Sequence, residues 1–352
     1  MNMPNLIRTK KYDPLWKSLG ILFVGFVITF GVSNYVSQEE EFQSQKEFVI
    51  ACNEAKTKIF LRINLHIQFL INASSFFEAS QLVTRKEWEQ FNKFSTINEN
   101  FMGVQGFGFS AIVKKDQLKK HIQDIRKEGF SKYTVYPNGG RVLYTSIIYL
   151  EPFNERNARV LGFDMFTEPV RRKAMEQARD YKIPVLSGKV MLHQETQKDV
   201  QTGTLIYVPV YNKNEPLNTI AERRSAILGW VFSPFRMDDL MKSILGSWNL
   251  NRDENIRLRV YDDAIISQNS LLFDSHKNRT KSNSDARIRT RKLPVLFNNK
   301  KWTLVFSQPL RSPFFFSAKT LIIAIGGMII SLLLFALSYS LLITKQRAKS
   351  IA

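Results

Sequence analysis

The chain has 352 residues, of which 44% are hydrophobic and 23% are charged, and this composition excludes a disordered protein. It leaves room for one or two folded domains with a sizeable core. The net charge of +19 fits either nucleic acid or an anionic membrane surface, but the Lys and Arg residues are spread along the chain, so we expect no nucleic-acid partner. Cys52 is the single cysteine, which excludes an internal disulfide.

Two stretches predict membrane-spanning helices. No residue from Ser18 to Gln38 is charged, and the same holds from Thr320 to Thr344. About 20 apolar residues in a helix cross a hydrocarbon core of about 30 Å. We therefore predict transmembrane helices over residues 18–38 and 318–344. A cleaved signal peptide is the alternative for the first stretch, but its apolar run is longer than usual and no A-x-A site follows.

The flanking charges predict the orientation of both helices. Basic residues precede the first helix and follow the second, whereas Glu39, Glu40 and Glu41 follow the first. Positive charge favours the cytoplasmic side. We therefore expect residues 1–17 and 345–352 to be cytoplasmic and residues 39–317 to lie outside, in a multi-pass protein of the inner or plasma membrane. The basic residues are Arg8, Lys10, Lys11, Lys17, Lys345, Arg347 and Lys349.

The segment from Glu39 to about Phe94 predicts a long helix. Its apolar residues recur at steps of three and four. We expect a stalk over residues 39–75 that continues into a domain core. The same stripe could also form a dimer seam, which predicts a homodimer. The stripe consists of Phe48, Cys52, Ala55, Ile59, Ile63, Ile67, Leu70 and Phe77.

Downstream of the stalk, the pattern predicts an α+β fold with antiparallel sheets. A first region, residues 76–240, contains two predicted helices, 115–127 and one that ends near Tyr181, with Thr167 as its N-cap. A second, smaller region, residues 241–317, includes a dense basic run from Arg279 to Lys292, which we interpret as a solvated face that could also contact lipid headgroups. The predicted strands span residues 104–113, 133–140, 142–150, 185–192, 204–210, 226–232, 256–261, 271–273 and 286–306.

The stretch from about Phe76 to Leu240 resembles the CHASE domain, the extracellular sensor of many receptor kinases and cyclases. The resemblance implies tandem PAS-like subdomains behind a long helix, with a small-molecule or short-peptide ligand in the membrane-distal one. The matching segments are Phe76–Ser80, Val83–Trp88, Tyr144–Pro152, Gly162–Met165, Glu168–Arg172, Ala178–Arg179, Val185–Ser187, Pro209–Tyr211 and Gly229–Phe232.

The resemblance also implies ligand-contacting positions. In cytokinin receptors of this family an Asp hydrogen-bonds the ligand, and Asp164 falls at its place. Leu192 matches a pocket Leu, and Tyr207 replaces a smaller pocket Thr, which argues against a cytokinin ligand. Tyr144 and Phe232 fall on further pocket positions. From the residues alone, Asp164 is equally well read as a turn carboxylate that accepts backbone N–H groups, and the others as core.

No pattern points to catalysis. The four histidines lie at no zinc-binding spacing, and neither a P-loop nor a G-x-S-x-G motif occurs. We therefore expect no enzyme activity, no metal and no cofactor, and a separate kinase or cyclase as the output partner. Two alternatives stay open: a ligand-free envelope scaffold, and an N-terminal fragment of a sensor kinase or cyclase.

Overall fold

The structure is a computed structural model that describes residues 14–97, 103–192, 200–246, 256–277, 287–298, 300–310 and 317–351. The basic residues expected before the first membrane helix, at positions 8, 10 and 11, lie outside the described residues, as does the larger part of the basic run after Arg279. The chain divides into two compact units, residues 1–50 with 311–352, and residues 51–310. Each unit is described by itself.

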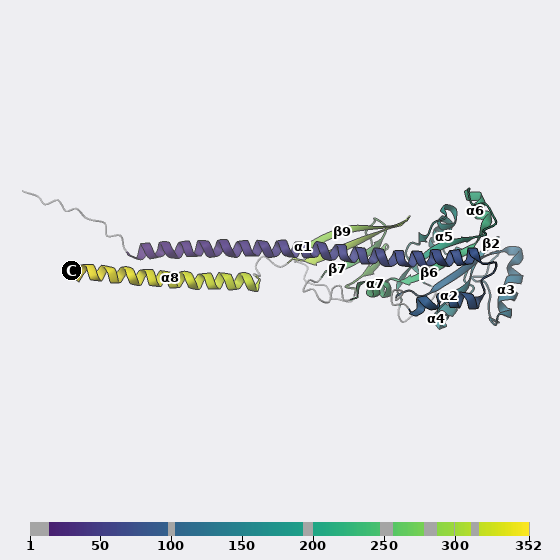
Figure 1. The fold of residues 1–352 in the computed structure, drawn as a ribbon, viewed down its shortest axis with the longest axis horizontal. Helices are drawn as coiled ribbons and strands as arrows, with labels where there is room; N and C mark the ends of the chain where they lie inside the picture. Colours follow the sequence, from purple (N-terminus) through teal and green to yellow (C-terminus); the bar gives the residue numbers. More distant parts are fainter. Residues whose placement is uncertain are drawn as a thin grey trace, which may run out of the picture. The chain divides into compact units, whose positions relative to one another are not determined.

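The first unit consists of two apolar helices. The N-terminal part of α1 (Pro14–Ala79) and α8 (Ala318–Ile351) are each long and apolar enough to cross a membrane (Figure 1). Small residues let the two helices approach closely, as is common between membrane helices. A Cβ atom at Gly25 would lie 2.4 Å from Ser331 Oγ, and one at Gly327 would lie 2.4 Å from Thr29 Oγ1.

The second unit contains two antiparallel sheets. The large sheet has the order β2-β1-β6-β5-β3, with β4 paired to β5, and the small sheet has the order β8-β7-β10-β9. This arrangement confirms the predicted α+β class, with two sheet subdomains between a long N-terminal helix and an apolar C-terminal one. The strands are β1 (Phe107–Lys114), β2 (Leu143–Glu151), β3 (Val185–Leu186), β4 (Val190–Met191), β5 (Thr202–Tyr211), β6 (Ile227–Arg236), β7 (Arg257–Asp262), β8 (Leu271–Asp274), β9 (Ile288–Phe297) and β10 (Lys300–Pro309).

Short helices cover the large sheet. The most deeply packed is α5 (Pro169–Tyr181), whose apolar face buries Ala174, Met175 and Ala178 in the core cluster that β5 and β6 also form. The other helices and helical turns are α2 (Arg85–Ile97), η2 (Lys115–Gln117), α3 (Leu118–Lys127), α4 (Glu155–Ala158), η3 (Met165–Thr167), α6 (Ile220–Ala226) and α7 (Met237–Leu245).

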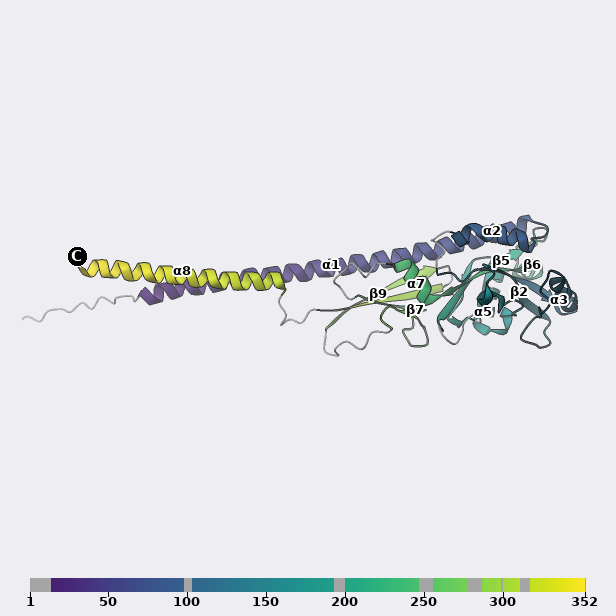
Figure 2. The same ribbon diagram turned by 90° about the horizontal axis from the view of Figure 1, so that it is seen from below.

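The apolar stripe of α1 packs on the sheets of its own chain within the second unit. Cys52, Ile59, Ile63 and Leu70 are all fully buried, and α1 runs beside both sheets (Figure 2). The ring of Phe77 stacks on Phe109 of β1 at 4.1 Å. This stripe therefore cannot at the same time be a dimer seam.

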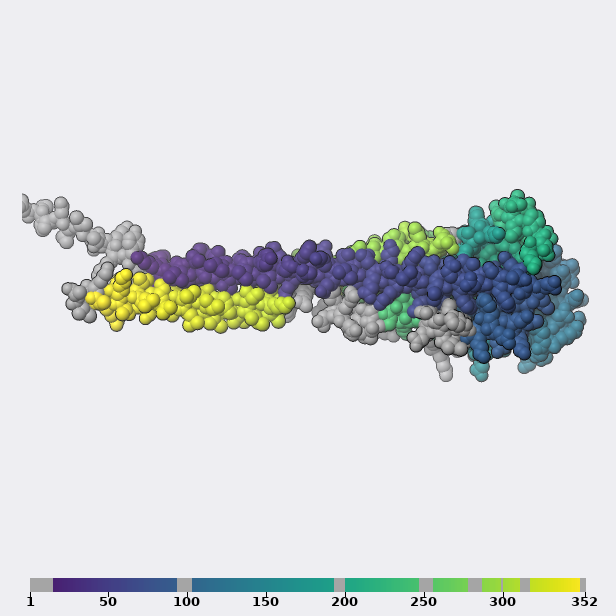
Figure 3. Space-filling model, viewed as in Figure 1, coloured from purple at the N-terminus to yellow at the C-terminus, as the bar shows by residue number. Residues whose placement is uncertain are grey.

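A different face of α1 lies at the surface of this unit (Figure 3). It carries two large apolar side chains, Leu61 and Leu65, that are 60% and 41% exposed. The neighbouring Phe60 is 42% exposed, but its ring stacks on Phe297 of β9. If the chain forms a homodimer along α1, the contact has to use this exposed face.

Four local predictions differ from the structure. The helix predicted to reach about Phe94 ends at Ala79, and α2 restarts at Arg85. The reason is a capping pair: Glu87 N donates to Thr84 Oγ1, and Glu87 Oε2 accepts from Thr84 N. The strand predicted over residues 133–140 is reduced to one bridge, between Tyr136 and Phe163.

The third difference concerns the start of α5. Its N-cap is Glu168 and not Thr167, because the Glu168 carboxylate accepts from Val170 N and Arg171 N at 3.1 and 2.8 Å. The Thr167 hydroxyl instead donates to Asp164 O. The strand predicted over 185–192 is likewise split into the two short strands β3 and β4.

Candidate functional site

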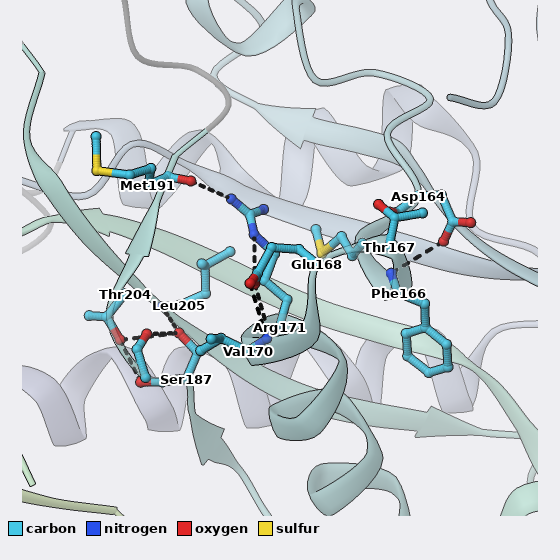
Figure 4. Close-up of polar contacts among 12 residues, drawn as sticks. Asp164, Phe166, Thr167, Glu168, Val170, Arg171, Ser187, Met191, Thr204 and Leu205 are labelled. Atoms are coloured by element: carbon cyan, nitrogen blue, oxygen red, sulfur yellow. Dashed lines mark hydrogen bonds and ion pairs between the residues drawn. The ribbon is translucent and has the colours of Figure 1, made fainter. Parts of the chain in front are cut away.

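Asp164 lies at the start of η3, fully buried against β2. Its Oδ1 atom accepts hydrogen bonds from Thr145 N at 2.9 Å and Thr145 Oγ1 at 2.8 Å. It also accepts one from Phe166 N at 3.2 Å (Figure 4). These donors satisfy one carboxylate oxygen and fix the turn that leads into α5. Asp164 therefore acts as a turn carboxylate that accepts backbone N–H groups, which was one of the two roles expected from the sequence.

The second carboxylate oxygen of Asp164 is held by Arg141, a residue that the sequence did not single out. Arg141 Nε lies 2.9 Å from Asp164 Oδ2. The guanidinium also lies over the ring of Tyr144, 4.8 Å from its centroid. Tyr144 Oη accepts from Arg141 N at 3.1 Å and donates to Gly139 O at 2.9 Å. Arg141 thus connects two of the five predicted site residues, Asp164 and Tyr144.

The other three predicted site residues share one apolar cluster. Tyr207 on β5 and Phe232 on β6 are cross-strand partners with ring centroids 6.3 Å apart, and Leu192 follows β4. The Tyr207 hydroxyl donates to Met165 Sδ at 3.4 Å, next to Asp164. Tyr144 belongs to a separate apolar cluster. The structure therefore groups four of the five residues around η3 and connects the fifth through Arg141.

Two glycines let these side chains pack directly on the backbone. A Cβ atom at Gly203 would lie 2.5 Å from Leu192 Cγ, and one at Gly108 would lie 2.5 Å from Phe232 Cζ. Real Cβ atoms do not approach other atoms so closely, so larger residues would displace Leu192 and Phe232. The two glycines therefore set the depth at which this cluster packs on the large sheet.

Arg171 adds a buried positive charge to the same region. The residue is 3% exposed and projects from the first turn of α5 toward β4, where one amino group donates to Met191 O at 3.2 Å (Figure 4). The guanidinium lies 5.3 Å from the ring centroid of Phe163. Its Nε atom is 3.9 Å from Glu168 Oε2, and the residues that the structure describes offer this atom no hydrogen-bond acceptor.

The phenols around this charge stay protonated. Burial raises the pKa of Tyr207 far above its usual value, although the nearby Arg171 charge opposes the rise. Burial also raises the pKa of Tyr136 to about 12, again opposed by Arg171. Both hydroxyls are therefore hydrogen-bond donors at neutral pH. Both already donate within the protein, Tyr207 to Met165 Sδ and Tyr136 to Arg159 O. The Nε–H of Arg171, which has no acceptor among the described residues, is therefore the donor that suits this region to hold an acceptor group.

A chain of hydrogen bonds leads from this region toward α3. Ser146 Oγ, next to Thr145, lies 2.6 Å from Tyr133 Oη, which in turn lies 2.8 Å from His121 Nε2. Burial lowers the pKa of His121 and raises that of Tyr133 to about 12. His121 is therefore neutral at pH 7, and the hydrogen-bonded series of Ser146, Tyr133 and His121 carries no charge.

An α+β domain that carries buried polar groups, in a chain with two apolar helices that can span a membrane, has the architecture of a membrane-attached sensor. The family model of the CHASE domain matches residues 81–273, which is more than half of the chain. The chain therefore belongs to the CHASE-domain family, whose domain is an extracellular sensor in signalling receptors. The matched range includes Asp164, Arg171 and the whole large sheet.

One curated relative is a signal transduction histidine kinase. The chain is 22% identical, over 258 residues, to hybrid signal transduction histidine kinase A of Dictyostelium discoideum. The match covers 69% of this chain but only 12% of the length of that relative. The chain therefore spans only a small part of the length of that relative.

Proposed function

We propose that this protein is a membrane-anchored extracytoplasmic sensor that binds a small ligand in the large-sheet domain. The observation that carries the proposal is the buried guanidinium of Arg171, whose Nε–H has no acceptor among the described residues. A buried, unsatisfied polar group costs about 1 to 3 kcal/mol, and more when it is charged. A ligand with an acceptor atom would remove that cost.

The ligand site of this proposal lies between η3, α5 and β4–β6. It comprises Asp164, Leu192, Tyr207 and Phe232, with Arg171 as the residue that binds the acceptor. Tyr144 on β2 is connected to it through Arg141. The five predicted site residues, including Tyr144, are each at most 4% exposed. A ligand therefore has to displace side chains in order to enter. This tight packing favours a small molecule or the end of a short peptide over a bulky ligand. The Tyr207 phenol occupies interior volume, which further limits ligand size.

The membrane arrangement of this proposal follows from the charges next to the apolar helices. Both chain ends are cytoplasmic, and residues 39–317 lie outside the inner or plasma membrane. Residues 76–240 form the membrane-distal ligand-binding domain, and residues 241–317 form a membrane-proximal subdomain. Membership of the CHASE-domain family supports the extracellular placement.

The output of the sensor belongs to another protein in this proposal. The chain itself is not an enzyme; a kinase or cyclase partner reads a change in the two membrane helices. The histidine kinase named for the relative supports this class of partner. Homodimerisation through the exposed face of α1 would let ligand binding shift the balance between two helix arrangements.

A thermal-shift screen tests the proposal, with the full chain in detergent and a library of small carboxylates, amides and heterocycles. A ligand at 100 times its Kd stabilises the folded state by about 2.7 kcal/mol, so we expect at least one compound to raise Tm. The variant Arg171→Met should lose that shift. Its matched control is Arg172→Met, because the neighbouring Arg172 is exposed and pairs with Glu176.

Two results would contradict the proposal. One is a complete absence of stabilising compounds, which would favour a ligand-free scaffold. The other is a ligand whose Tm shift is the same in Arg171→Met as in Arg172→Met, since that ligand would bind elsewhere.

A further inference from the structure

A cavity lies between the two sheets of the second unit, outside the site proposed above. Its volume is about 780 Å³, within the range of small-molecule sites. One wall comes from α5 and the segment that joins β3 to β4, and the other from the β7–β8 loop and the start of β10. The cavity thus separates the large-sheet domain from the small sheet.

The polar lining of this cavity is dominated by amines. It contains four lysines, Lys173, Lys189, Lys300 and Lys301. In the described part of the chain, the amines of Lys173 and Lys301 have no ion-pair or hydrogen-bond partner. Lys189 Nζ makes one long contact, 3.4 Å from Gln268 O. Three of the four amines are therefore available to a ligand.

The two acidic residues of the lining are already engaged. Asp262 Oδ1 pairs with Lys300 Nζ at 2.7 Å, and Asp262 Oδ2 accepts from Lys189 N at 3.0 Å. Asp263 is exposed, and its Oδ1 accepts from Ala264 N at 2.6 Å. Four lysines against two aspartates leave the cavity with an excess of positive charge. Hydroxyl groups of Ser267 and Ser270 also line it.

The cavity spans the contact between the two sheet subdomains. Asp262 of β7 accepts from the backbone of Lys189, which precedes β4. Asn298, between β9 and β10, donates to Pro184 O just before β3. Lys173 stands on the α5 side and Lys301 on the β10 side. A ligand with two or more negative groups could contact both walls at once.

We propose that this cavity binds a small polyanion, with carboxylate or phosphate groups that pair with Lys173, Lys189 and Lys301. The site goes beyond the proposed function, because it shares no residue with the Arg171 region and its ligand would join the two subdomains. Bound there, the polyanion increases the stability of their contact. Charge-assisted hydrogen bonds from several amines to one anion supply the specificity.

Calorimetric titration of the full chain in detergent, at constant ionic strength, tests the site. Citrate and pyrophosphate are the polyanion probes, and they distinguish a carboxylate site from a phosphate site; acetate is the monovalent control. We expect saturable binding of one polyanion and none of acetate. The double variant Lys173→Gln/Lys301→Gln should weaken that binding by about tenfold, because it removes two of the three amines that pair with the anion.

The matched control is Lys120→Gln/Lys213→Gln, which removes two exposed lysines that do not line the cavity. This control should bind like the unmodified chain. The proposal is overturned if neither polyanion binds saturably, or if both double variants lose affinity equally. Arg171 does not line the cavity, so Arg171→Met should still bind the polyanion. If Arg171→Met loses only the thermal shift described above, that result concerns the proposed function and not the lysine-lined cavity.

Discussion

Replacing Asp164 by alanine is expected to destabilise the extracytoplasmic domain by about 3 to 5 kcal/mol, as does removal of one partner from a buried ion pair. The carboxylate is fully buried, and Thr145 N, Thr145 Oγ1 and Phe166 N all donate to it. Alanine would remove the acceptor of Thr145 N and the counter-charge of the Arg141 guanidinium, whereas Phe166 N would keep Thr145 Oγ1 and Arg141 would keep Pro137 O as acceptors. Urea unfolding of the full chain in detergent, followed by tryptophan fluorescence, measures the change.

The control for this prediction is Asp124→Asn. Asp124 is 49% exposed and, among the described residues, forms its ion pair with Lys127 at 3.4 Å, so its replacement should change the free energy of unfolding by no more than about 0.5 kcal/mol. Equal effects of the two substitutions would show that the buried network around Asp164 contributes little to stability.

The second large effect is expected for Trp230→Ala, at about 3 to 5 kcal/mol. Trp230 on β6 is fully buried between the large sheet and α5. Its Nε1–H donates to Met175 O at 2.9 Å, and its ring lies 5.4 Å from that of Phe166. Alanine would leave a cavity under α5 and remove the side-chain donor to Met175 O. Circular dichroism during urea unfolding measures the loss without using the removed fluorophore.

The variant Trp230→Phe divides this effect into its parts. Phenylalanine keeps most of the apolar volume but cannot donate to Met175 O. We expect it to lose clearly less stability than Trp230→Ala. If the two variants were equally destabilised, the packing of α5 on β6 would depend on the hydrogen bond and not on the buried ring.

Local sequence patterns predicted most strands and both apolar helices, because alternation and long apolar runs are local features. The end of α1 was missed, although a signal was present: Thr84 and Glu87 form a T-x-x-E capping pattern at the start of α2. The split between β3 and β4 was not visible, because it depends on the contact of this segment with Asp262, which is far away in the sequence.

The polar residues of the candidate site were predicted only in part. Asp164 was identified by family resemblance, but its partner Arg141 comes from a loop 23 residues earlier in a pairing that no local pattern encodes. Arg171 did leave a signal. It interrupts an apolar stripe of α5 that continues through Ala174, Met175 and Ala178. A charged residue at such a position indicates either a buried ion pair or a binding site.

The sensor interpretation depends on the claim that residues 39–317 lie on the extracytoplasmic side of the membrane. Cysteine labelling tests this claim most directly. Cys52, the single cysteine, is buried, and burial raises the pKa of its thiol to about 12, so it should not react. The variant Lys213→Cys places a reactive thiol on an exposed loop after β5. In cells with an intact cytoplasmic membrane, a membrane-impermeant maleimide should label this variant and leave the unmodified chain unlabelled. Labelling of Lys213→Cys only after lysis would contradict the account.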